Sequence, residues 1–171
     1  MRRLKAAHFI GVCSLFATST LYAWDDVSSD YAYSCATQDP NCYILDVRTD
    51  DEWRWVGHPG LDKAGNGADL EGKVVNISWR VMWRDELVEN WRFLRDVRKV
   101  LGRSKHVELI TMCRSGSRSQ AAAAALEAAG YTNVHNMTHG FEGGKDPSGY
   151  RTVNGWKVDG YPYNDSAEGG Y

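Results

Sequence analysis

A cysteine followed by a short loop of small and basic residues carries the clearest chemistry in this sequence. Residues 109–126 read LITMCRSGSRSQAAAAAL, so Cys113 ends an apolar run, and an alanine-rich stretch follows the loop. The apolar run predicts a strand and the alanine-rich stretch predicts a helix. Cys113 therefore stands at a junction from strand to helix, which is where ligands bind in parallel α/β sheets.

The loop after Cys113 suits the stabilisation of negative charge. Its small residues let the backbone curl round the sulfur, so that consecutive N–H groups point at one place in front of a helix N-terminus. Together with two arginines, this environment favours the nucleophilic thiolate. We therefore expect Cys113 to attack an anionic substrate rather than to be an inert buried thiol. The residues expected to bind that substrate are Arg114, Ser115, Gly116, Ser117, Arg118 and Ser119.

The first 23 residues have the layout of a secretory signal. A basic start precedes an apolar run over residues 9–17, and the segment ends on the small residue Ala23. An uncleaved anchor and a buried N-terminal helix are the alternatives, but the run is too short to span a bilayer. Cys13 lies within the run and does not resemble a lipoprotein attachment cysteine. We therefore expect residues 24–171 to form one domain in the bacterial periplasm or outside the cell.

Charge argues against two classes of partner. Residues 1–23 contain three basic and no acidic residues, which leaves 17 Lys and Arg against 22 Asp and Glu, a net charge of −5. We therefore expect neither nucleic acid nor an anionic membrane as the main partner, and no stable membrane insertion after cleavage. The histidines of residues 24–171 are too scattered to suggest a metal site, and we expect no metal and no organic cofactor. These histidines are His58, His106, His135 and His139.

Two more cysteines flank a stretch that favours a turn. Cys35 and Cys42 are separated by ATQDPN, and an oxidising compartment allows them to form a disulfide. Such a bridge would stabilise the fold by roughly 2 kcal/mol. The alternative is that Cys42 is a buried strand residue and Cys35 a half-buried helix residue. In either case Cys113 remains the unpaired thiol.

Strand and helix patterns alternate along the chain. This alternation predicts an α/β fold with a largely parallel sheet and helices on both faces. The Gly-rich segment 57–73 predicts a loop, and the turn-rich tail is expected to wrap the domain. The predicted strands cover residues 42–48, 74–78, 107–113 and 133–137. The predicted helices cover residues 25–36, 50–56, 85–101 and 119–129.

The segment CRSGSRS resembles the active-site loop of single-domain rhodaneses, which are sulfurtransferases that carry sulfur as a cysteine persulfide. Further similarity lies in YILDVRTDDEWRWVGHPG, VVNISW, GFEGG and GWKVDGYP, which follow the family's order over residues 25–163. The resemblance implies a three-layer domain with about five strands. It also implies that Cys113 takes sulfane sulfur from thiosulfate or a similar small anion and passes it to a thiol, a protein acceptor or cyanide.

Two other functions stay open. One is a persulfide carrier or binding module that serves a dedicated partner, because a carrier needs the same loop. The other is a cysteine phosphatase or arsenate reductase, whose loops place five residues between cysteine and arginine. Here four residues separate Cys113 from Arg118, and the shorter loop fits a persulfide better than a tetrahedral anion.

The resemblance also gives roles to residues that follow the first long strand. Asp46, Arg48 and Glu52 are expected to brace the sheet through ion pairs rather than to take part in catalysis. His58 is expected to fix its loop by a hydrogen bond, because a preformed thiolate needs no general base.

The segment 57–73 is longer than in the resembled family. It is either a mobile surface loop or, together with nearby tryptophans, a docking surface for a sulfur-acceptor protein. The tryptophans are Trp53, Trp55, Trp79, Trp83 and Trp91.

Overall fold

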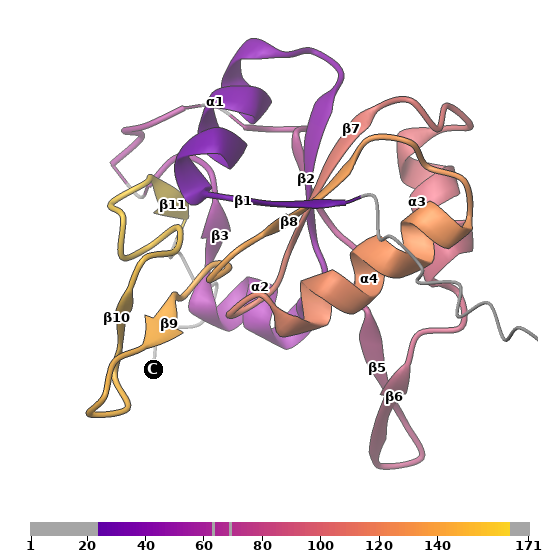
Figure 1. Cartoon of the computed structure of the whole chain (residues 1–171). Coiled ribbons are helices and arrows are strands. Elements are labelled where there is room, and N and C mark those ends of the chain that lie inside the picture. The colour runs from indigo at the N-terminus through magenta and orange to yellow at the C-terminus, as the bar shows by residue number, and fades with distance from the viewer. Residues whose placement is uncertain (1–23, 63, 69, 165–171) are drawn as a thin grey trace, which may run out of the picture.

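Five strands form the middle layer of the structure, a computed structural model that describes residues 24–62, 64–68 and 70–164 (Figure 1). The strand order is β1-β8-β7-β2-β4, and every neighbouring pair is parallel. The α/β prediction is confirmed, whereas the expected signal at residues 1–23 lies outside the described residues. The strands are β1 (Asp25–Val27), β2 (Cys42–Asp46), β4 (Val74–Asn76), β7 (Glu108–Met112) and β8 (Val134–Met137).

Successive residues of the central strands point into two separate hydrophobic cores. Leu45 of β2 and Leu109 of β7 belong to one core, while Ile44 and Ile110 belong to the other, and all four are fully buried. Side chains alternate between the faces of a strand, and a parallel sheet covered on both faces needs apolar residues at successive positions. This explains why these strands read as continuous apolar runs.

In the part of the chain that the structure describes, four helices complete the outer layers. They are α1 (Ser29–Gln38), α2 (Asp50–Val56), α3 (Phe93–Leu101) and α4 (Ser117–Ala128). Side chains of α3 and α4 fill one core, and side chains of α1 and the C-terminal tail fill the other. Ala122 and Ala123 of α4 are fully buried, so the absence of larger side chains brings this helix close to the sheet.

The predicted helix over residues 25–36 is wrong at its beginning. Asp25–Val27 forms the edge strand β1, which pairs with β8, and the helix starts only after Ser28. The Ser28 side chain caps α1 by accepting a hydrogen bond from the backbone N–H of Tyr31 at 3.1 Å. A strand of three residues has too little pattern to be recognised without its partner strand.

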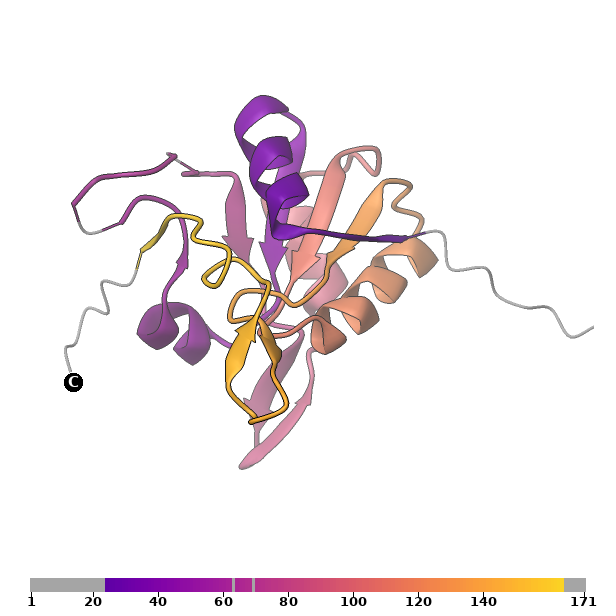
Figure 2. The ribbon, with the colours of Figure 1, turned by 60° about the vertical axis from the view of Figure 1, so that its left-hand side comes forward.

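The predicted helix over residues 85–101 is wrong in its first half. β5 (Arg80–Trp83) and β6 (Glu86–Glu89) form an antiparallel hairpin, and the helix begins only at Phe93. Arg84 and Asp85 make the turn, with φ of 48° and 66°, which is the left-handed backbone of a tight hairpin. Figures 1 and 2 show that this hairpin projects from the body of the domain.

The C-terminal tail wraps the domain, as expected. It contains the short pair β9 (Gly144–Lys145) and β10 (Arg151–Val153), and its last strand β11 (Tyr163–Asn164) pairs with β3 (His58–Pro59). The predicted loop over residues 57–73 therefore begins with a strand. In the described part of the chain, no helix is long and apolar enough to cross a membrane.

Candidate active site

Cys113 lies between the end of β7 and the start of α4. It is 1% exposed and is the free cysteine of the described residues. Its sulfur accepts a hydrogen bond from the backbone N–H of Gly116 at 3.2 Å. The Ser119 hydroxyl lies 3.4 Å from the same sulfur and 2.8 Å from the Gly116 carbonyl. Because a hydroxyl has one hydrogen, the shorter bond to Gly116 competes with the contact to sulfur.

The backbone of the loop leaves donors for an anion. Within the described residues, no acceptor binds the N–H groups of Arg114, Ser115, Ser117 and Arg118. Gly116 has a left-handed φ of 101°, and a left-handed residue next to helical ones gathers successive N–H groups into a nest. The helix begins at Ser117, two residues before the predicted start. The predicted binding residues therefore divide between a three-residue loop and the first turn of α4.

The segment after β8 holds this loop in place. The backbone N–H of Phe141 donates to the Cys113 carbonyl at 2.8 Å, and that of Glu142 donates to the Arg114 carbonyl at 3.0 Å. Gly140 has a φ of 59°, and a Cβ there would lie 2.2 Å from the Cys113 carbonyl oxygen. This role of Gly140 was not predicted, although GFEGG belongs to the family pattern, because the contact joins distant parts of the chain.

Arg118 is bound by a carboxylate of α2. Its two terminal nitrogens donate to the two Glu52 oxygens, each at 2.6 Å. Glu52 also completes a capping box with Thr49. Burial acts to raise the pKa of Glu52, but the hydrogen bonds from Arg118 and Thr49 outweigh it and lower the pKa to about 2. The hydrogen bonds to Glu52 raise the pKa of Arg118, so the pair stays ionised and ties α2 to α4.

The Glu52–Arg118 pair reduces the positive charge that is available to a substrate. Arg114 and Arg118 were both predicted to orient an anionic donor. Arg114 is exposed and makes no ion pair among the described residues, whereas the charge of Arg118 is already compensated by Glu52. The backbone N–H groups and Arg114 are therefore the donors that remain for a substrate.

A buried ion pair lies under the same edge of the sheet. Arg48 and Asp46 are both fully buried and approach to 2.6 Å. Arg48 also donates to the Gly57 carbonyl at 2.7 Å and lies 4.1 Å from the centre of the Phe141 ring. Because Phe141 also bonds the Cys113 carbonyl, the ion pair connects the end of β2 with the segment that holds the active-site loop.

His58 is packed against the neighbouring helix. Its ring stacks on Trp53 with 3.9 Å between ring centroids, and its Nδ1 lies 3.1 Å from the Pro59 carbonyl. Burial is the main influence on its pKa and lowers it, which favours the neutral imidazole. None of its hydrogen bonds within the described residues reaches Cys113.

The other two cysteines form a disulfide at the opposite edge of the sheet. Cys35 and Cys42 are bonded, with 5.8 Å between their Cα atoms. Together with Glu108 they are the one group of metal-ligand side chains that converges within the described residues. Their two sulfurs are bonded to each other, so this group offers no metal site while the disulfide is intact.

The five tryptophans do not form one cluster. Trp53 stacks on His58, and Trp79 packs edge-on against Phe93. Trp83 and Trp91 contact each other beside the β5–β6 hairpin and are 51% and 59% exposed. The fifth, Trp55, is also exposed. Of the loop over residues 57–73, Lys63 and Asp69 lie outside the described residues, and Leu70 is buried.

Comparison with known proteins agrees with this geometry. The family described as "Rhodanese-like domain" matches residues 30–146. An uncharacterized protein of Rickettsia conorii, RC0915, is 31% identical over 75% of this chain and 93% of its own length. Thiosulfate sulfurtransferase 18 of Arabidopsis thaliana is 31% identical over 72% of this chain and 82% of its own.

Two solved structures share the fold. Rv0390 from M. tuberculosis superimposes with a TM-score of 0.67 at 32% identity, covering 83% of this chain and 98% of its own. A polysulfide-sulfur transferase homodimer from Wolinella succinogenes superimposes with a TM-score of 0.54 at 19% identity, covering 87% and 85%. The second likeness concerns the fold alone.

Proposed function

Because the chain belongs to the rhodanese-like domain family, we propose that it is an exported sulfurtransferase that works through a persulfide on Cys113. The donor is thiosulfate or a similar small sulfur anion, and the acceptor is a thiol or cyanide. The observation that carries this proposal is the free sulfur of Cys113 next to backbone N–H groups that have no acceptor among the described residues.

Two displacement steps account for the transfer. In the first, the Cys113 thiolate attacks the outer sulfur of thiosulfate and forms the S–S bond of a persulfide. Sulfite leaves with the electron pair of the broken bond. In the second, cyanide or a thiolate attacks the outer sulfur, giving thiocyanate or a new persulfide, and the Cys113 thiolate returns. The loop N–H groups stabilise the negative charge in both states.

The tight cover over Cys113 favours sulfur over phosphate. The residue is 1% exposed, and the backbone of Gly140 lies so close that a Cβ there would collide with the Cys113 carbonyl oxygen. A single sulfur atom adds little volume next to the Gly116 N–H, whereas a tetrahedral phosphate needs a wider loop. This supports sulfur transfer over the phosphatase and arsenate reductase alternative.

The disulfide supports export to an oxidising compartment. Cys35 and Cys42 are bonded, and structural disulfides persist mainly in the periplasm and outside cells. We propose that residues 1–23 direct this export and that the domain then works in the periplasm or the medium. The measurement is N-terminal sequencing of the protein after expression in a bacterium, which should begin at Trp24 in the periplasmic fraction.

We further propose that the sulfur acceptor is a protein and that it docks on the β5–β6 hairpin. Trp83 and Trp91 are exposed there. The hairpin follows the carboxyl end of β4, and Cys113 follows the carboxyl end of β7, so both lie at the same edge of the sheet. Replacing both tryptophans by alanine should slow transfer to a protein acceptor and leave transfer to cyanide unchanged. Deletion of residues 63–70 is a poorer test, because it removes the buried Leu70.

Steady-state kinetics with thiosulfate and cyanide test the proposed enzyme. We expect parallel double-reciprocal lines, the sign of a ping-pong cycle, and a loss of at least about 10⁴-fold in turnover for Cys113→Ala. Loading of sulfur with negligible turnover would instead identify the carrier. Release of phosphate from an ester, with no thiocyanate formed, would contradict sulfur transfer.

A further inference from the structure

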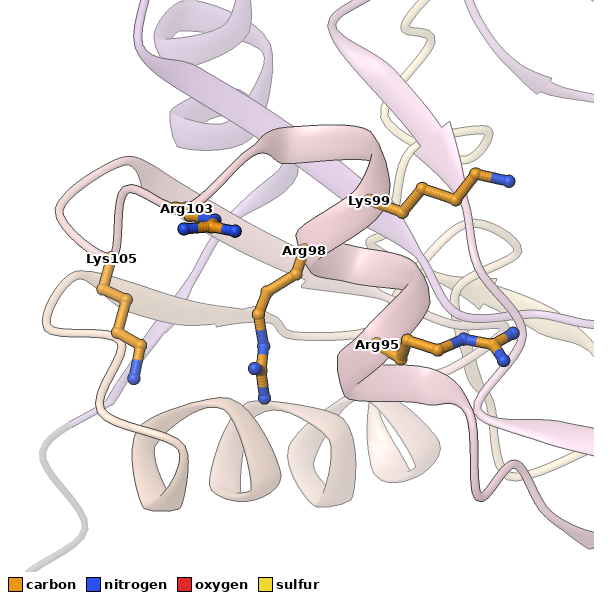
Figure 3. Close-up of a pocket in the computed structure, with 5 residues that line it drawn as sticks. All are labelled: Arg95, Arg98, Lys99, Arg103 and Lys105. Atoms are coloured by element: carbon orange, nitrogen blue, oxygen red, sulfur yellow. The ribbon is translucent and has the colours of Figure 1, made fainter.

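Five basic side chains line one hollow at the edge of the domain away from Cys113. The hollow has a volume of about 560 Å³, and every residue that lines it is a cation. Figure 3 shows them: Arg98 and Lys105 extend toward α4, Arg103 lies between these two on the loop after α3, and Arg95 and Lys99 extend on the other side of α3. The residues are Arg95, Arg98, Lys99, Arg103 and Lys105.

Two of the five cations already have partners. Arg95 donates to the Asp96 carboxylate at 2.8 Å. Lys105 donates to the Ala129 carbonyl, and a cation at this place also compensates the negative end of α4. Among the described residues, Arg98, Lys99 and Arg103 have neither a hydrogen bond nor an ion pair from their side chains.

The uncompensated charges are costly to hold together. Lys99 lies four residues after Arg95, and both side chains extend on the same side of α3 (Figure 3), where like charges repel. Arg98 and Lys99 are in the last turn of the helix, which the helix dipole favours. That effect does not explain Arg103, which lies beyond the helix and adds its charge to the same hollow.

We propose that this hollow is a binding site for an anion with several closely spaced phosphate groups. The rest of the protein is acidic, so a hollow lined by cations alone is a local inversion of charge that attracts multivalent anions. Its volume is within the range of ligand pockets. Guanidinium groups match phosphate by paired N–H donors, and two of the three unpaired cations are arginines. This proposal is independent of the sulfur chemistry.

The site is separate from the sulfur site. Lys105 binds the last turn of α4, whereas Cys113 precedes its first turn. A helix of 12 residues is about 18 Å long. A ligand in the hollow therefore does not cover Cys113, and we expect it to leave the turnover of thiosulfate and cyanide unchanged.

Calorimetric titration with sodium tripolyphosphate tests the site directly. We expect one site whose affinity falls as salt is added, and a loss of roughly tenfold or more in the Arg98→Gln/Arg103→Gln variant. The matched control is Arg80→Gln/Arg84→Gln, which removes two exposed cations from the β5–β6 hairpin and should bind normally. Lys105 is left in place because it caps α4.

Vesicles distinguish the two sources of phosphate. If vesicles of phosphatidylglycerol, but not of phosphatidylcholine, bind the protein through Arg98 and Arg103, the phosphates are lipid headgroups. If tripolyphosphate alone binds, the ligand is soluble. The proposal is wrong if neither probe binds, or if the two variants lose affinity equally.

Discussion

Sulfur at the two edges of this sheet is kept in two different chemical states. At the amino edge, Cys35 and Cys42 are joined in a disulfide where α1 leads into β2. At the carboxyl edge, no other cysteine of the described residues pairs with Cys113, and the donors around its sulfur come from the backbone and a hydroxyl. Sulfur is thus structural where a partner cysteine is near, and it is available for reaction where backbone N–H groups and a hydroxyl face it.

The two edges also differ in how far their charged side chains are paired. Around Cys113 two ion pairs hold most of the charge, with Asp46 bound to Arg48 and Glu52 bound to Arg118, and Arg114 is left for a substrate. At the basic hollow the cations outnumber their partners. We infer that the carboxyl edge holds a fixed geometry for chemistry at one atom, whereas the amino edge leaves charge free for a ligand.

The buried ion pair should give the largest effect on stability. Arg48→Ala leaves the fully buried Asp46 without its partner, and we expect a loss of about 3–5 kcal/mol in the free energy of unfolding. The control is Arg54→Ala, whose ion pair with Asp50 is 68% and 63% exposed, and which should lose less than about 1 kcal/mol. Urea unfolding measures both. Similar losses in the two variants would show that the buried ion pair of Arg48 does not stabilise the fold more than an exposed one.

The Glu52–Arg118 pair should give an intermediate effect that depends on pH. The pKa of Glu52 falls from 4.5 to about 2 on folding, so its stabilisation is complete above pH 4.5 and is lost as the pH falls toward 2. Glu52→Gln should therefore cost on the order of 2–3 kcal/mol at pH 7, and the difference from the wild type should shrink steadily below pH 4.5. A difference that stays constant from pH 7 to pH 3 would contradict this assignment.

Removal of the disulfide should have the smallest effect on stability of the three changes, and it should have no effect on sulfur transfer. Replacing Cys35 and Cys42 by alanine should lower the free energy of unfolding by about 2 kcal/mol, because the bridge closes a short loop. Thiosulfate turnover of the folded variant should be unchanged, since these residues lie at the edge opposite Cys113. Loss of turnover without loss of folding would mean that the two edges are coupled.

Much of the active-site edge could be predicted from the sequence because its signals are local. The apolar run before Cys113, the small residues after it and the alanines of α4 are consecutive in the chain. The pairing of Cys35 with Cys42 was also an open prediction from a short spacing, and the structure contains that bond. Local patterns of this kind report on backbone geometry directly.

Contacts between distant segments could not be predicted in the same way. The strand at Asp25–Val27 exists because β8 lies beside it, and Gly140 matters because it touches Cys113. The strand β6 was mistaken for the first part of a helix because Leu87, Val88 and Trp91 also fit helical spacing. The charge at Arg118 was assigned to the substrate, whereas Glu52 from another helix already binds it.

The intact mass of the protein after incubation with thiosulfate tests the central claim most directly. The wild type and the Cys35→Ala/Cys42→Ala variant should each gain the mass of one sulfur atom, and cyanide should remove it. Cys113→Ala should gain nothing. If the wild type with a free Cys113 thiol stays unchanged, or if Cys113→Ala still gains sulfur, the assignment of the persulfide to Cys113 is wrong.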